Sequence, residues 1–176
     1  ALPIFSGFRL GVRPEVAPKI LVAGLREGML RLAGREADGA IINWLSADDV
    51  TRVAGIVNAQ GPDKELVCRI FVCPSENTEV VRAGARYAIA AYLNVPVYAE
   101  FHRWLGRGEA LAGMWDAWKA GDRKAALAAI PDSVVDDLVV HGSPAECRAK
   151  IDRYFANGVN TSSLAILAFD PAVNFW

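Results

Sequence analysis

The chain has 176 residues, of which 53% are hydrophobic, and a formal net charge of −1 at pH 7. This length suits one sizeable core, so we expect a single domain over residues 1–176. The near-neutral charge gives no reason to expect nucleic acid or an anionic membrane as a partner, and no apolar run approaches the roughly 20 residues of a membrane helix. The three cysteines, Cys68, Cys73 and Cys147, lack CxxC spacing, which favours reduced thiols of a cytoplasmic protein over a metal site.

The first residues predict little regular structure. Residues 2–10 hold a short apolar run broken by Ser6-Gly7, which is more typical of a β-hairpin or an irregular segment than of a helix. Pro14 and Pro18 follow, and they disfavour helix and hold the backbone extended.

The stretch from Lys19 to Ser46 predicts a strand, a helix and a second strand. Ile20–Ala23 and Ala40–Ile42 are unbroken apolar runs, as expected of strands that are covered on both faces. Such a βαβ unit has a right-handed crossover and implies a parallel sheet. Apolar residues recur between the strands at helical spacing and form the expected buried stripe: Met29, Leu30, Leu32, Ala33 and Ala37.

The pattern then repeats once. Ser46 and Asp49 have the spacing of a capping box at the start of a helix. Leu66–Cys73 is the third predicted strand, and the helix after it starts with Glu76 and Glu79 in its first turn and ends near Leu93.

A long helical excursion separates the third strand from the last. Residues 97–118 are rich in aromatic side chains and are broken at Gly106-Arg107-Gly108, so we expect two short helices that form an insertion or lid at about residues 94–120. Residues 122–138 are expected to be helical, with a break near Pro131.

The end of the chain predicts one more helix and strand. Ser143 and Glu146 form a second capping box, with proline between them at the first helical position. Leu164–Phe169 is wholly apolar and is therefore expected to be a central strand. Four strands alternating with helices predict a parallel α/β fold, either a doubly wound sheet or a (β/α) barrel, and spacing does not separate the two.

Ligands of such folds bind beyond the carboxyl ends of the strands. Gly24 would let a ligand approach the backbone there, and Arg26 could bind phosphate, although spacing alone favours a plain turn and a solvated arginine. Asn43 offers an amide to a ligand or to a loop, and Trp44 is either core or pocket wall. No GxGxxG or GxxxxGK[ST] motif is present to support a dinucleotide or P-loop site.

Acid–base residues are not identifiable from the pattern. His102 and His141, the only histidines, are better explained by packing or structural roles than by catalysis. Asp136 and Asp137 are adjacent on a helix and do not share a face, so they are expected to be solvated. The catalytic residues therefore stay unknown.

Several motifs together resemble a known family. The sequence is similar to the C-terminal half of luciferase-like flavin monooxygenases, and within them to actinobacterial oxidoreductases that use the deazaflavin coenzyme F420 in place of FMN. The resemblance runs from Gly7 to Phe169 and is carried by GFRLG, PKILVAGLREGMLRLAGREADGAIINWLS, YLNVPVYAEFHRWLG and VVHGSPAECRAKIDRYFANGV.

This resemblance implies an oxidoreductase built on a (β/α)8 TIM barrel, of which this chain is the C-terminal half with a helical excursion before the last strand. It implies coenzyme F420, or alternatively FMN, and a small-molecule substrate. A non-catalytic half-barrel interaction module is the other alternative. The family binds the cofactor phosphate at two successive strand ends, which correspond to Ala23, Gly24, Leu25 and Arg26 and to Asn43, Trp44 and Leu45.

The chain departs from the family in two ways. The family's N-terminal half-barrel is absent, so we expect a homodimer or association with that half, and little activity from this chain alone. Leu25-Arg26-Glu27 also stands where the family often has Gly-Pro.

Overall fold

The computed structural model describes residues 7, 11–12, 14–61 and 63–169. The segment 2–10, for which a hairpin or irregular structure is predicted, lies almost wholly outside the described residues. No helix within the described residues is both long and apolar enough to cross a membrane.

The described residues contain one sheet of five strands, all paired in parallel. Strand β3 is the longest: β2 pairs with residues 65–69 and β4 with residues 71–73 along one side of it, and β5 pairs with residues 67–72 along the other. Strand β1 extends the sheet beyond β2. The parallel arrangement predicted from the sequence is confirmed. The strands are β1 (Leu21–Ala23), β2 (Gly39–Asn43), β3 (Glu65–Cys73), β4 (Val139–His141) and β5 (Thr161–Ile166).

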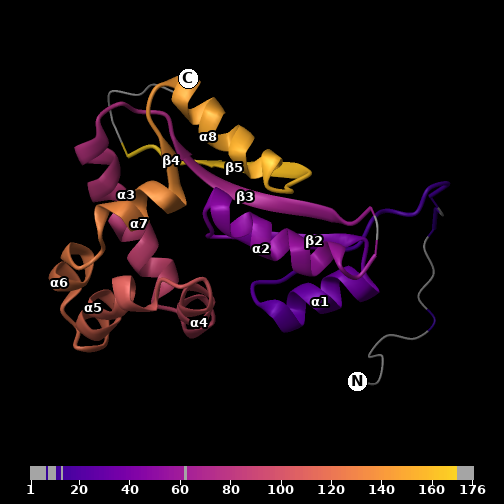
Figure 1. Cartoon of the computed structure of the whole chain (residues 1–176), viewed down its shortest axis with the longest axis horizontal. Coiled ribbons are helices and arrows are strands. Elements are labelled where there is room, and N and C mark those ends of the chain that lie inside the picture. Colours follow the sequence, from indigo (N-terminus) through magenta and orange to yellow (C-terminus); the bar gives the residue numbers. More distant parts are fainter. Residues whose placement is uncertain (1–6, 8–10, 13, 62, 170–176) are drawn as a thin grey trace.

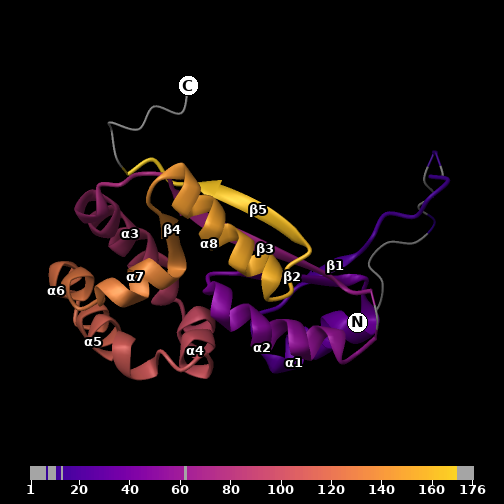
Figure 2. The same ribbon diagram turned by 45° about the horizontal axis from the view of Figure 1, so that its top comes forward.

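Three helices cover the outer face of the sheet, which we define by Ala40, Ile42 and the other side chains in register with them. These are α1 (Glu27–Glu36), α2 (Ala47–Asn58) and α8 (Pro144–Ala156), and α8 packs against α2 and β4 (Figure 2). The capping boxes predicted for α2 and α8 are both formed. Fully buried aliphatic side chains from both layers make this core: Leu30, Ile42, Val50, Val53, Val57 and Leu66.

The helix α1 buries a narrower stripe than predicted. Leu30 and Ala33 are fully buried, but Met29 is 46% exposed and Leu32 is 37% exposed. Gly34 does not face the strands; it faces α2, where a Cβ would lie 2.5 Å from the carbonyl oxygen of Val57. The close approach of α1 to α2 therefore depends on this glycine.

The inner face of the sheet carries the opposite side chains, and it is covered only at the carboxyl end of β3. Phe71 and Cys73 of β3 pack there against helices of the excursion. Trp44, directly after β2, is 1% exposed and stacks on Phe71 with ring centroids 3.9 Å apart. Further along the same face Ile41 and Arg69 are exposed, so the inner face is half core and half open surface.

The excursion between β3 and β4 consists of helices gathered where β3 ends (Figure 1). The predicted break between two short helices is confirmed, with α4 and α5 on either side of Gly106. The predicted start of the preceding helix is wrong for Glu76, because Asn77 caps a helix that begins at Thr78. The helices are α3 (Thr78–Leu93), α4 (Pro96–Trp104), α5 (Gly108–Lys119), α6 (Arg123–Ala128) and α7 (Asp132–Leu138).

Two strand predictions need correction. The last strand is Thr161–Ile166, not Leu164–Phe169, and it is not central: among the described residues it pairs only with β3, and Leu164 is 47% exposed. The apolar residues of this strand do not mean that it is buried, because no described helix lies over its outer face. The strand β4 was not predicted, since three residues directly after a helix give no periodicity to detect.

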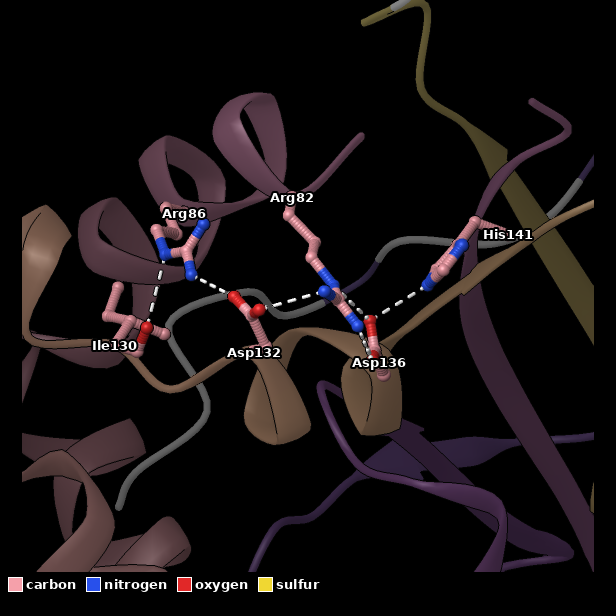
Figure 3. Close-up of polar contacts among 6 residues, drawn as sticks. All are labelled: Arg82, Arg86, Ile130, Asp132, Asp136 and His141. Carbon is pink, nitrogen blue, oxygen red and sulfur yellow. Dashed lines mark hydrogen bonds and ion pairs between the residues drawn. The ribbon is translucent and has the colours of Figure 1, made fainter. Parts of the chain in front are cut away.

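An ion-pair network ties α3 to α7 and β4 (Figure 3). Arg82 donates hydrogen bonds to Asp132 at 2.8 Å and to both carboxylate oxygens of Asp136, which also contacts Nε2 of His141 at 2.9 Å. Arg86 binds Asp132 and the carbonyl oxygen of Ile130. Asp136 is therefore a structural partner and not the solvated carboxylate predicted. Partial burial would raise its pKa, but the bonds from Arg82 and His141 outweigh burial and lower it.

Candidate functional site

An open cavity of about 780 Å³ lies at the carboxyl ends of β1 and β2. Its floor is the loop from β1 into α1, one wall is the open part of the inner face, and α4 forms the opposite wall. The position follows from parallel topology, since neighbouring parallel strands end at the same edge of a sheet. The principal lining residues are Ala23, Gly24, Leu25, Arg26, Met29, Ile41, Asn43, Arg69, Val97, Tyr98 and Trp104.

The floor of the cavity is the start of α1. Gly24 donates its backbone N–H to the carbonyl oxygen of Ile41 at 3.1 Å, and a Cβ on Gly24 would lie 3.3 Å from the backbone of Met29. Arg26 occupies the N-cap position, and its side chain makes no capping hydrogen bond. The first N–H groups of α1 are consequently left for solvent or a ligand, at the end of the helix that carries partial positive charge.

The sheet wall of the cavity is polar. Asn43 donates from its amide nitrogen to the hydroxyl of Tyr98 at 3.1 Å, which links β2 to α4. The Oδ1 atom of Asn43 is buried and has no hydrogen-bond partner among the described residues. Arg69 lies beside Asn43 in the strand register and is exposed, with its guanidinium 5.0 Å from the ring centroid of Phe71.

Two arginines hold α4 and the excursion against α2. Arg52 donates to the carbonyl oxygen of Trp104 at 2.6 Å and lies over that indole ring, 3.7 Å from its centroid. Arg107, between α4 and α5, forms an ion pair with Asp49 at 2.8 Å in which both side chains are 12% exposed. The α4 wall is therefore fixed to the carboxyl end of β2 through the first turn of α2.

The residues predicted as the cofactor site separate into two groups. Ala23, Gly24, Leu25 and Arg26 line the cavity together with Asn43. Trp44 and Leu45 do not line it: they are 1% and 3% exposed and belong to the two hydrophobic cores. The backbone of Trp44 is left-handed, with φ of +55°, which turns its ring onto Phe71.

Neither histidine lies in the cavity wall. His102 is fully buried, and both of its ring nitrogens lack hydrogen-bond partners among the described residues. Burial, and then the charge of Arg107, lowers the pKa of His102 to about 4. His141 is buried at the end of β4 and pairs with Asp136. The structural roles expected of the histidines agree with these positions, and no general acid or base is assigned.

Sequence reasoning did not identify Arg69 or Tyr98 as residues of the cavity. Arg69 is the single charge in the run LVCRIFVC, and such an isolated charge within a buried strand was the available signal. Tyr98 was placed in the aromatic excursion, but its bond to Asn43 joins residues 55 positions apart and has no local signature.

Comparisons with known proteins agree with this geometry. The family model for luciferase-like monooxygenases matches residues 3–161. No curated protein sequence shows significant similarity to the chain. Among solved structures, a coenzyme F420-dependent tetrahydromethanopterin reductase from Methanopyrus kandleri is similar at a TM-score of 0.67 and 16% identity, over 87% of this chain and 46% of that one.

Two further structures extend the comparison. An F420-dependent secondary alcohol dehydrogenase in complex with an F420–acetone adduct has a TM-score of 0.62 and 15% identity, over 94% of this chain and 48% of its own. The FMN complex of a type II Baeyer–Villiger monooxygenase from Pseudomonas putida has a TM-score of 0.50 and 20% identity, over 89% and 44%. This chain spans about half the length of these structures, and their likeness shows a shared fold. The parallel half-sheet, its outer helices and the family match together place the chain in the luciferase-like monooxygenase family.

Proposed function

We propose that the chain is the cofactor-binding half of an oxidoreductase that uses coenzyme F420 and acts on a small organic substrate. The observation that carries the proposal is the cavity at the ends of β1 and β2, with the uncapped start of α1 and Arg26 on its floor. Backbone N–H groups at a helix start and a guanidinium are the donors that bind phosphate in proteins.

The residues present fit a phosphorylated flavin-type cofactor. Gly24 keeps the backbone accessible at the floor, and Asn43 and Tyr98 offer an amide and a hydroxyl at the wall. When bound, the deazaflavin supplies hydride-transfer chemistry. The chain would hold the phosphate, orient the ring against the sheet wall and limit access of water from the side of α4.

FMN is the alternative cofactor, because a solved structure with the same fold contains FMN and the donors on the floor of the cavity suit a phosphate, which both cofactors carry. A non-catalytic half-barrel module is the alternative outside enzymes, because the described residues offer no acid–base pair in the cavity. The F420 proposal is preferred on the resemblance of the whole sequence and on the two F420-dependent proteins of the same fold.

Titration of the purified chain with F420 and with FMN, followed by tryptophan fluorescence, tests these alternatives, since Trp104 lies in the cavity wall. Saturable quenching by F420 at lower concentration than by FMN is the expected result. Tighter binding of FMN would make FMN the cofactor in place of F420. Binding of neither cofactor by a folded chain would favour the non-catalytic interaction module.

A further inference from the structure

The open part of the inner face carries a polar row across three neighbouring strands. The register pairs Asn43 of β2 with Arg69 of β3, and Arg69 with Ser163 of β5. Partners in a parallel sheet share a face and lie about 5 Å apart, so the three side chains stand side by side. The row lies between apolar levels, with Ile41 and Val67 on one side and Phe71 on the other.

Arg69 is the centre of this row and is not used by the protein itself. It forms no side-chain hydrogen bond or ion pair among the described residues, whereas arginines elsewhere in the cavity region, Arg52 and Arg107, are engaged. Its contact with the ring of Phe71 restrains the guanidinium at the cavity wall without satisfying its N–H groups. A planar fork with five donors facing a cavity is suited to an anionic oxygen group.

The two cationic positions in the cavity are separate. Arg26 stands on the floor at the start of α1, and Arg69 stands on the sheet wall, two strands away from β1. Asn43 adds an amide beside Arg69, and Ser163 adds a hydroxyl on its other side. We propose that the row Asn43–Arg69–Ser163 binds a second anionic group, a carboxylate or phosphate, of the ligand in this cavity.

The proposal rests on the proposed function for the identity of that ligand, but not for the anion site itself. The anionic group belongs either to the organic substrate or to a part of the cofactor distant from the phosphate on the floor. In both cases Arg69 favours an anionic ligand over an uncharged one, because only the anion accepts charge-assisted hydrogen bonds from the guanidinium.

Calorimetric titration of the chain with benzoate and with inorganic phosphate tests the anion site. The variants are Arg69→Gln, Arg69→Lys and, as the matched control, Arg148→Gln, which removes the same charge from an exposed position on α8. Wild type and Arg148→Gln are expected to bind at least one anion saturably. Arg69→Gln should weaken that binding about tenfold or more, with Arg69→Lys in between.

A fourth variant tests the anion site while Arg69 itself is kept. Ser163→Asp places a carboxylate next to the guanidinium at an exposed position and should suppress anion binding by pairing with it. Equal affinities in wild type and Arg69→Gln, or no saturable binding of either anion to the folded chain, would overturn the proposal.

Cofactor titrations separate the two sources of the anion. If Arg69→Gln weakens F420 but leaves FMN unchanged, whose single phosphate would lie on the floor, the second anionic group is the deazaflavin cofactor's. If it weakens benzoate and leaves the cofactors unchanged, the group is the substrate's. If the chain binds anions at Arg69 but binds no cofactor, the proposed function is wrong and this inference stands. If the chain binds a cofactor equally well with and without Arg69, and binds neither benzoate nor phosphate at Arg69, this inference is wrong and the proposed function stands.

Discussion

At the scale of single residues, chemistry and stability are assigned to different side chains around the cavity. Arg26 is on its floor with no structural partner among the described residues, while Asn43 is bound to Tyr98. His102 and Trp44, close by, are buried and contribute packing. A substitution at Arg26 should therefore affect ligands, and one at His102 should affect folding.

Arg26→Ala should weaken cofactor binding by about 1–2 kcal/mol, because it removes a charge-assisted hydrogen bond to phosphate. Fluorescence titration measures the change in dissociation constant. Ser143→Ala is the control: it removes the cap of α8, far from the cavity, and should cost about 1 kcal/mol of unfolding free energy with cofactor affinity intact. An unchanged dissociation constant for Arg26→Ala would make Arg26 a solvated surface residue.

His102 should make the chain sensitive to mild acid. Its native pKa of about 4 lies below the 6.5 of an unfolded histidine, so the unfolded state takes up a proton first. Stability should therefore fall as the pH drops from about 6.5 towards 4, by about 3 kcal/mol in total. Urea unfolding of wild type and His102→Phe over this range measures the effect. The variant should show the shallower decline, and parallel curves would contradict the assignment.

At the scale of elements, the excursion is joined to the sheet by a small number of polar contacts in addition to its own core. The ion pair of Arg107 with Asp49 is the most buried of these, and Ser46 also donates to Asp49 from its backbone and hydroxyl. The second attachment is the contact of Asp136 with His141 of β4, and Arg82 of α3 holds Asp136 in place. The cavity wall formed by α4 depends on the first attachment.

Arg107→Met should destabilise the chain by about 3 kcal/mol, because it leaves the largely buried carboxylate of Asp49 without its cation. The matched control is Arg31→Met, whose pair with Glu27 is about half exposed and should be worth under about 1 kcal/mol. Urea unfolding measures both values. A double-mutant cycle with Asp49→Asn should show coupling of about 1 kcal/mol or more, and additive effects would rule out a direct pair.

At the scale of the whole molecule, the chain has open edges and an open face. Among the described residues, β1 pairs only with β2, and β5 pairs only with β3. Ile41, Leu164 and Ile166 are 38%, 47% and 51% exposed at or near these edges. Unpaired edges and exposed apolar side chains favour association with another chain or segment.

The 176-residue chain should therefore associate in solution and should not turn over substrate by itself. Light scattering with intact-mass spectrometry is expected to give a species of at least twice 19.0 kDa. Addition of a family N-terminal half-barrel, if it is the natural partner, should compete with self-association. A soluble 19.0 kDa monomer that oxidises or reduces substrate with F420 would contradict this prediction.

The sequence allowed the parallel strands and capped helices to be predicted because their signals are local. Ala40–Ile42 and the box at Ser46 show their structure within a few residues. The β4 strand, the position of β5 and the pairing of Asn43 with Tyr98 could not be predicted in this way, since each is decided by contacts between distant segments. The residues of the cavity floor were predicted as cofactor-binding residues, and they line the cavity. Trp44 could be assigned to the core only from its left-handed backbone, which the sequence does not reveal.

The three pairings of β3 have a consequence for the order of folding. β1, β2 and β3 follow one another closely in sequence, but β5 is separated from β3 by a long stretch of chain. The hydrogen bond between Leu66 and Asn160, for example, joins residues that are 94 positions apart. Closing such loops costs entropy before it yields contacts, so the first three strands with α1 and α2 should form earliest. Native-state hydrogen exchange should then find the slowest amides in β3 and faster ones in β5 and β4. The strand that is central to the sheet would also be the nucleus on which the second half of the chain assembles.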